Sequence, residues 1–457
     1  MARISTATIA LSMLCLSSPP AFANGRFPSA DQLLIDPADA RHWILRATFG
    51  LLQSHDAGQS FSWICEDAVG YAQDRDPALA IVANGTVLAG FSRELRASRD
   101  DACAWVSPFP EAAQESLLDA TADPADENDA FFLSHSLSSS HEVRIFSARD
   151  DGSPLAPLDL ALGDDFSPVT VEVAPSAPNR LYVTGILNDL STVLLRSDDR
   201  GQSWVRHEIS PHSSAPAYIA AVDPSDPDRL YLRLDDDTTD YLLVSEDGGS
   251  SFSEAFSLDA DMLGFALSPD GAHLAVGGPM AGLFLADSKT LSFTQSPSGL
   301  LGPTCLKWTE SDGLIACGRE SIDQFTLARS DDGQQFSALY HLGALQPLSC
   351  DQGSSVGSQC ASVWPGVAHT LGIDLGSASA GSTGTVRAQG GGCALSAGRA
   401  SGARWLAVAG LLSCAIAARR RRRALESRSS RPTARVCGGG HRVRVRSQVV
   451  RAHARDR

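Results

Sequence analysis

Aspartates stand at matching places in several segments of this 457-residue chain. Asp56, Asp199, Asp247 and Asp331 each precede a glycine by two residues and an aromatic residue by five. Two carboxylates can hydrolyse a glycosidic bond, one as acid and one as base or nucleophile, when they lie about 5–10 Å apart. Carboxylates at equivalent places of successive repeats would lie far apart. We therefore interpret these four as structural groups, not as a catalytic set.

Two other groups of side chains could bind a metal ion. Residues 235–237, with Asp240, offer the oxygen ligands that Ca²⁺ prefers, but their spacing matches no EF-hand or other dedicated loop. Four histidines, His135, His141, His207 and His212, show no metal-ligand spacing and have no cysteine pair beside them. A solvated turn and ordinary loop or strand histidines are favoured, and we predict no metal, no cofactor and no catalytic residue.

The aspartates belong to an internal repeat with the pattern S-x-D-x-G-x-x-[WF]. Three segments match it in full: Ser54, Asp56, Gly58 and Phe61; Ser197, Asp199, Gly201 and Trp204; and Ser245, Asp247, Gly249 and Phe252. A fourth copy keeps Asp331, Gly333 and Phe336, with its serine moved to Ser330. Weaker copies begin at positions 98, 148 and 286, so successive copies start 41–50 residues apart. This interval is the length of a four-stranded antiparallel blade with its turns.

A second repeated phrase, rich in proline, precedes several copies. Residues 223–231 resemble residues 174–182, and residues 36–43 are a looser relative. In the S-x-D-x-G segment the aspartate can accept backbone N–H groups, the glycine gives backbone freedom, and the aromatic residue packs on the hairpin. Each repeat is thus predicted to run strand, proline-rich turn, strand, hairpin, strand, S-x-D-x-G turn, strand.

Together the two phrases resemble the Asp-box (BNR) propeller superfamily over roughly residues 30–345. The resemblance implies an all-β fold: a single seven-bladed β-propeller of four-stranded antiparallel blades, which we place at residues 30–366. The superfamily includes sialidases, sortilin-type receptors, xyloglucan-cleaving enzymes and photosystem assembly factors, so it selects no activity. The arginine signal of sialidases is not matched, because Arg26-Phe27-Pro28 lies before the first predicted strand.

The N-terminus has the three-part layout of a secretory signal. Arg3 precedes an apolar stretch that ends at Ala21-Phe22-Ala23, which predicts a signal peptide at residues 1–23 and export. The residues from Arg387 onward carry 17 arginines against Glu426 and Asp456, which leaves a net charge of −32 on residues 24–386. So acidic a body would repel nucleic acid and anionic membranes, and we predict no nucleic-acid partner.

Six cysteines fall in the predicted propeller and the segment after it: Cys65, Cys103, Cys305, Cys317, Cys350 and Cys360. An even number fits disulfides in an oxidising compartment, although six cysteines allow 15 pairings and free buried thiols are the alternative. Nearness in sequence favours Cys305–Cys317 and Cys350–Cys360, the second closing a Gly/Ser loop. It leaves Cys65 to pair with Cys103.

The C-terminal part has the features of a sorting tail. A Gly/Ser-rich linker (367–392) precedes Cys393, an apolar run (405–418) and five arginines (419–423). The run is short for a permanent membrane anchor, since 14 helical residues span only about 21 Å. The segment 393–423 resembles the myxobacterial MYXO-CTERM signal, which implies transient membrane insertion through 405–418, processing at Cys393, and display on the outer membrane surface or release. Residues 424–457 are either a basic tail or an artefact of the gene boundary.

The favoured function is a monomeric, non-enzymatic binding module for an extracellular glycan or protein. Its ligand is expected on one rim or at the central channel, where loops of several blades converge. The alternatives are a glycoside hydrolase acting on extracellular polysaccharide and a structural or assembly factor. A carboxylate pair in an open cleft would favour the hydrolase.

Overall fold

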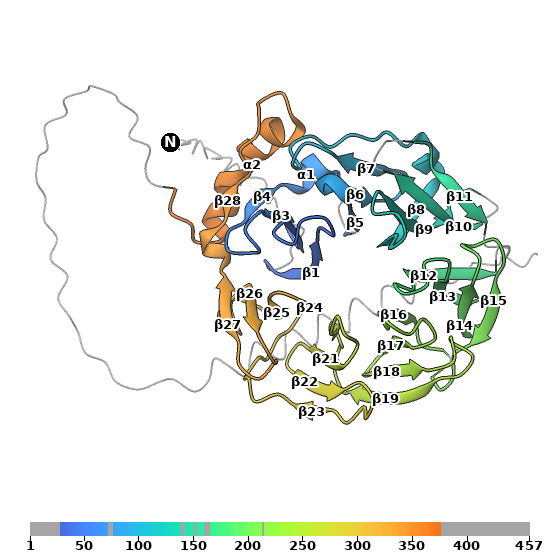
Figure 1. The fold of residues 1–457 in the computed structure, drawn as a ribbon. Coiled ribbons are helices and arrows are strands. Elements are labelled where there is room, and N and C mark those ends of the chain that lie inside the picture. The colour runs from blue at the N-terminus through green and yellow to red at the C-terminus, as the bar shows by residue number, and fades with distance from the viewer. Residues whose placement is uncertain are drawn as a thin grey trace, which may run out of the picture. The chain divides into compact units, whose positions relative to one another are not determined.

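The structure is a computed structural model that describes residues 28–71, 76–138, 142–149, 153–159, 165–212 and 214–375. Its strands form seven mainly antiparallel sheets arranged as blades around a central axis, which confirms the predicted seven-bladed propeller (Figure 1). Consecutive strands pair within each blade, and the first strand of each blade lies nearest this axis. We call the ring of first strands the channel wall.

The strands of the first four blades are, in order: β1 (Ala30–Ile35), β2 (Trp43–Ala47), β3 (Gly50–Ser54) and β4 (Ser62–Ile64); β5 (Ala78–Val82), β6 (Thr86–Gly90) and β7 (Leu95–Ser98); β8 (Glu115–Ala122), β9 (Asp129–Ser136), β10 (Val143–Arg149) and β11 (Ala156–Asp159); β12 (Phe166–Val173), β13 (Leu181–Leu187), β14 (Thr192–Ser197) and β15 (Val205–Glu208). In blade two, a bridge between Ala97 and Val106 stands in the place of the fourth strand.

The last three blades contain β16 (Ala217–Val222), β17 (Leu230–Asp236), β18 (Thr239–Ser245) and β19 (Ser253–Leu258); β20 (Gly264–Leu267), β21 (His273–Gly278), β22 (Gly282–Asp287) and β23 (Thr294–Gln295); and β24 (Cys305–Thr309), β25 (Gly313–Cys317), β26 (Leu327–Ser330) and β27 (Ser337–Tyr340). Short 3₁₀ turns occur at Ala83–Gly85, Pro110–Gln114 and Leu342–Ala344. Two α-helices, α1 (Glu66–Val69) and α2 (Ser355–Thr370), and a last strand, β28 (Gln346–Pro347), complete the described elements.

The core lies between the blades. In blade four, Val193, Leu194 and Leu195 are consecutive and all fully buried, because a middle strand is covered by a neighbouring blade on each face. The fourth strand faces solvent on the outside of the ring, and three of the four residues of β15 are exposed. The middle strands therefore have continuous apolar sequences, whereas the outer strands have polar sequences.

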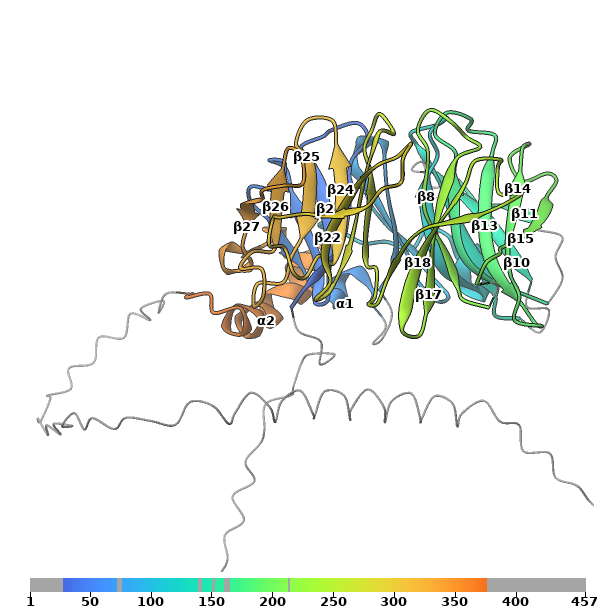
Figure 2. The ribbon, with the colours of Figure 1, turned by 90° about the horizontal axis from the view of Figure 1, so that it is seen from below.

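Because consecutive strands in a blade run in opposite directions, the ring has two different faces. Each S-x-D-x-G segment joins the third strand of its blade to the fourth, so all of them lie on the face that also holds the proline-rich turns. We call this the repeat-turn face. The opposite face holds the hairpins between second and third strands, the connections between blades, and α1 and α2 (Figure 2). We call it the helix face.

The C-terminal segment after β27 closes the ring. β28 adds to blade one in parallel with β4, and α2 packs on α1 and on blade one, with the rings of Trp63 and Trp364 5.6 Å apart. The hydroxyl of Thr304, at the start of blade seven, donates to the carbonyl of Ala30 in β1. We call residues 341–371 the strap.

Disulfides tie the strap to the first two blades. Cys65 pairs with Cys360 and Cys103 with Cys350, across sequence separations of 295 and 247 residues. The predicted pairs Cys350–Cys360 and Cys65–Cys103 are therefore wrong, whereas Cys305 does pair with Cys317 inside blade seven. Nearness in sequence misleads here because the ring brings its two ends together.

The strap also corrects the predicted Gly/Ser loop between Cys350 and Cys360. Ser354 caps α2 by accepting a hydrogen bond from the N–H of Gly357 (3.0 Å), and the helix continues to Thr370, beyond the predicted end of the propeller at residue 366. Val356, Cys360 and Trp364 recur every four residues and are buried. This apolar stripe holds the helix on blade one despite its glycines and serines.

Candidate functional site

The S-x-D-x-G segments fold as one kind of turn, which we call the repeat turn. In the turn that begins at Ser197, the serine hydroxyl donates to Asp199 (2.8 Å) and accepts the N–H of Gly201 (2.7 Å). Asp199 in turn accepts the N–H and the hydroxyl of Ser203 (2.8 and 2.6 Å), and these hydrogen bonds lower the pKa of Asp199 to about 2. The turns at Ser54 and Ser245 repeat the same contacts.

Two less regular copies show which features of the turn are essential. At Ser98 the glycine is replaced by Ala102, which still adopts a positive φ of 60°, and Trp105 donates its indole N–H to the carbonyl of Ala102. In blade seven the turn is one residue shorter: Ser330 and Gln334 donate to Asp332. Asp331, the predicted turn aspartate of this copy, is therefore replaced in that role by Asp332.

The three full repeat turns are each bonded to the proline-rich turn of their own blade. The N–H groups of Ala57, Arg200 and Gly248 donate to the carbonyls of Arg41, Asn179 and Asp228, at 2.8–3.0 Å. The two repeated phrases thus form a single structural unit on one face. The predicted turn residues are distributed around the ring and are not gathered into one site.

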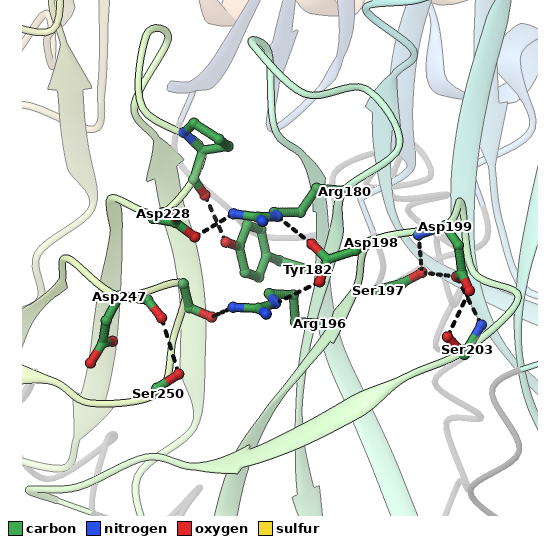
Figure 3. A network of polar contacts seen from close by, with 12 residues as sticks. Arg180, Tyr182, Arg196, Ser197, Asp198, Asp199, Ser203, Asp228, Asp247 and Ser250 are labelled. Carbon is green, nitrogen blue, oxygen red and sulfur yellow. Dashed lines mark hydrogen bonds and ion pairs between the residues drawn. The ribbon is translucent and has the colours of Figure 1, made fainter.

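Between blades four and five, charged side chains join neighbouring units (Figure 3). Arg180 donates to Asp198 of its own blade (2.6 Å) and to Asp228 of blade five (2.5 Å). Arg196 reaches the carbonyl of Gly248 (3.2 Å), and Tyr182 donates to the carbonyl of Pro227 (2.7 Å). All these groups are engaged with each other, so the network stabilises the blade contact and offers no open site.

A buried Asp–His pair in blade one has the composition of a catalytic dyad. Asp36 and His42 are each 4% exposed, and His42 Nδ1 lies 3.0 Å from Asp36 Oδ2. A general base would need its other nitrogen to face a nucleophile or a substrate. His42 Nε2 instead lies 3.1 Å from the amide nitrogen of Gln53, which also donates to Asp101 (2.8 Å). The pair is closed by Gln53 and does not form a hydrolytic site.

Two carboxylates lie on the channel wall, on the inner strands of blades three and four. Asp119 accepts the N–H of Val171 (2.9 Å), and Glu172 accepts the hydroxyl of Thr121 (2.8 Å). Burial is the main cause that raises the pKa of Asp119 to about 7, and burial also raises the pKa of Glu172. No repeat or motif in the sequence marks these two residues. Their bonds connect β8 with β12, which gives both groups a structural task.

A cavity of about 900 Å³ opens on the helix face beside the channel. Its wall is built from the start of β1, the loops before β20 and β24, the hairpin between β25 and β26, and both ends of the strap. Leu263, Ile322, Leu342 and Leu371 provide apolar surface, and Arg319 lies among them. Its volume is that of a pocket for a small ligand. A second cavity of about 480 Å³ follows the channel wall and shares Asp31 and Leu263 with the first.

Two residues of the metal sites considered from the sequence, Asp240 and His212, make other contacts. Asp240 is buried and accepts the N–H of Met262 (2.7 Å), while His212 stacks on Tyr241 and contacts Glu254 (3.2 Å). Within the described ranges, no group of three or more histidine, cysteine, aspartate or glutamate side chains could hold a metal ion. In the same ranges, no helix has the length and apolarity that crossing a membrane requires. The predicted signal (1–23), Cys393 and the run 405–418 lie outside these ranges.

The chain has only distant similarity to the known proteins that match it. No protein-family model and no curated protein matches the chain. Solved structures similar to it include a GH74 enzyme from Niastella koreensis (13% identity, TM-score 0.40, 68% of this chain and 65% of that one) and the GH74 xyloglucanase from Xanthomonas campestris (18%, 0.40, 70% and 61%). YCF48 from Cyanidioschyzon merolae is also similar (13% identity, TM-score 0.45, 67% of this chain and 94% of that one). The chain spans less than two thirds of the length of either GH74 structure, and no function follows from these matches.

Proposed function

We propose that this chain is an exported propeller of the Asp-box type that works as a non-enzymatic binding module, at the cell surface or after release. Its ligand would be an extracellular glycan or protein. The observation that supports it best is the cavity on the helix face, where loops from blades one, six and seven meet the strap. Loops held by a rigid scaffold are the usual place for recognition.

Export is supported by two independent features. The N-terminal residues have the layout of a secretory signal. The described part of the chain contains three disulfide bonds, which persist in oxidising compartments and are rare in the cytosol. The C-terminal Gly-Cys, apolar run and arginines support attachment or release at the surface.

A glycan array combined with a reducing-sugar assay on the purified protein tests the proposal. We expect glycan binding without sugar release. Leu263→Ser, at the cavity mouth, should weaken binding at least about fivefold, and Val205→Ser, an exposed apolar residue on β15, should leave it unchanged. Sugar release would overturn the non-enzymatic proposal. If neither glycan binding nor sugar release is detected, the glycans tested are excluded and protein ligands should be tested next.

The second candidate is a glycoside hydrolase, favoured by the raised pKa of Asp119 and Glu172 on the channel wall. A carboxyl that stays protonated near neutral pH can act as the general acid of glycosidic cleavage. If sugar release is observed, Asp119→Asn should abolish it. Retention of release by that variant would remove Asp119 from the mechanism.

A further inference from the structure

The cavity on the helix face contains a cation that forms no ion pair with any described side chain. Arg319 lies in the hairpin between β25 and β26 and lines the cavity, where its side chain is half-buried. Within the described residues, its guanidinium group makes no hydrogen bond and no ion pair, whereas its backbone N–H donates to Asp323 (2.9 Å). A half-buried guanidinium group has lost part of its hydration, so an anion from outside would bind to it favourably.

The neighbouring carboxylates are already engaged by other donors. Asp323 accepts the N–H groups of Leu301 (2.8 Å) and Gly302 (3.1 Å) in addition to that of Arg319. Glu320 accepts the hydroxyl of Thr326 (2.6 Å) and the N–H of Leu342 (2.7 Å), and lies 3.4 Å from His341 Nδ1.

Asp31 is 2.9 Å from the guanidinium group of Arg46. None of these carboxylates is within ion-pair distance of the guanidinium group of Arg319.

The remaining lining is largely apolar. Leu263, Ile322, Leu342 and Leu371 line the wall, and the hydroxyl-bearing residues are Ser29, Thr48, Thr304, Ser321 and Thr370. The apolar surface continues outside the cavity on the helix face of blade six. Leu263, Met280 and Leu301 are 42%, 71% and 47% exposed there, and the N–H of Met280 donates to the carbonyl of Leu301 (2.6 Å).

We infer that this cavity binds an amphiphilic carboxylate, a small molecule with one carboxylate head group and an apolar body. The head group would pair with Arg319, and the body would cover the leucine and isoleucine side chains toward blade six. This inference goes beyond the proposed function, because it assigns to the same cavity a small-molecule ligand that is neither a glycan nor a protein. It predicts selectivity by charge in a protein whose body is strongly acidic.

Two dyes that share an N-phenylnaphthylamine body provide the first test. 8-Anilinonaphthalene-1-sulfonate carries one anionic group, and N-phenyl-1-naphthylamine carries none. Titration of the full chain, followed by fluorescence, should show one saturable site that prefers the anionic dye. Arg319→Gln should weaken the anionic dye about tenfold to a hundredfold and leave the neutral dye unchanged, since a charged hydrogen bond is lost. Arg319→Lys should retain part of the preference.

Controls separate this inference from the proposed function. Arg206→Gln, at an exposed arginine on β15, should change neither titration, and all variants should keep the thermal unfolding of the parent. Decanoate should displace the anionic dye from the parent, and decanol should do so much less. If both dyes bind equally and Arg319→Gln has no effect while Leu263→Ser weakens both, the charge inference fails and the cavity remains a binding site. If Leu263→Ser changes neither dye, the site itself is overturned.

Discussion

Among single residues, the first serine of each repeat turn has the most constrained position. Ser197 is 1% exposed, and its hydroxyl both accepts the N–H of Gly201 and donates to Asp199. One small side chain thus satisfies a buried backbone donor and orients the carboxylate that closes the turn. A side chain without a hydroxyl leaves the N–H of Gly201 without this acceptor.

We expect Ser197→Ala to lower the free energy of unfolding by about 1–3 kcal/mol, because a buried N–H loses its acceptor. Ser250 offers a matched control: it is exposed, and its hydroxyl donates to the carbonyl of Asp247. Ser250→Ala should change the free energy of unfolding by less than about 0.5 kcal/mol. Chemical denaturation of both variants measures the difference, and equal losses would contradict the role given to Ser197.

The second prediction for a single residue concerns Gly249. Its φ is +87°, and a Cβ built on it would lie 2.0 Å from Cδ2 of Leu194 in blade four. Gly249→Ala should therefore destabilise the protein by about 2 kcal/mol or more, through backbone strain and a clash between blades. Gly353→Ala, with no atom within 4 Å of the added carbon, is the control. Thermal unfolding that shifts equally in both variants would show that the clash is relieved at no cost.

These residue-level features were the most predictable part of the molecule. A turn that requires a hydroxyl, a carboxylate and a positive φ at set positions leaves the same letters in each blade, so the repeat was visible in the sequence. The shortened turn in blade seven was not resolved, because Asp331 and Asp332 are adjacent and both precede Gly333. A proline-rich turn at Asp123 was also missed, although Asp123 accepts the N–H of Ala125 just as Asp36 accepts that of Ala38.

At the scale of elements, the strap reinforces the closure of the ring. Blades one and seven come from opposite ends of the propeller, and no blade combines strands of both. β28, α2 and two disulfides carry the connection instead. The apolar stripe of α2 was hidden by its glycines and serines, and the cysteine pairing depends on ring closure, so neither could be derived from local patterns.

Replacing Cys65, Cys103, Cys350 and Cys360 together by alanine should cost on the order of 5 kcal/mol, because each bridge closes a loop of more than 200 residues. The Cys305–Cys317 bond closes a much shorter loop, since only 12 residues separate the two cysteines. Replacing both by alanine should therefore lower the free energy of unfolding by about 3 kcal/mol or less. Denaturation under oxidising conditions compares the two variants. A larger loss for the Cys305/Cys317 variant would argue against closure by the strap.

At the scale of the whole molecule, the inner strands of two neighbouring blades bring Asp119 and Glu172 into a buried setting. The pKa of Asp119 is raised to about 7, so between about pH 4 and pH 7 the folded protein holds a proton that the unfolded chain has released. Stability should therefore fall as the pH rises through this window. Asp119→Asn should flatten that part of the profile, measured as unfolding free energy at pH 4.5 and 7.5. A parallel profile would show that Asp119 titrates normally.

The two faces of the ring differ in how far sequence could describe them. The repeat-turn face is built from phrases that recur, and their recurrence revealed the blade count and the strand order. The cavity on the helix face is built from loops of blades one, six and seven and from the strap, and these segments share no pattern. Such a site depends on which blades become neighbours when the ring closes, and Arg319 carries no signal of its own in the sequence.

The disulfides of the strap also join cysteines that are synthesised at very different times. Cys65 and Cys103 leave the ribosome well before their partners, which follow 295 and 247 residues later. At about 5–20 residues per second this interval lasts on the order of 10–60 seconds. In an oxidising compartment the two early thiols can join each other during that time, and the ring could then close only after thiol–disulfide exchange with Cys350 or Cys360. The yield of native protein should therefore depend on disulfide isomerase activity, and the trapped species would carry the Cys65–Cys103 bridge.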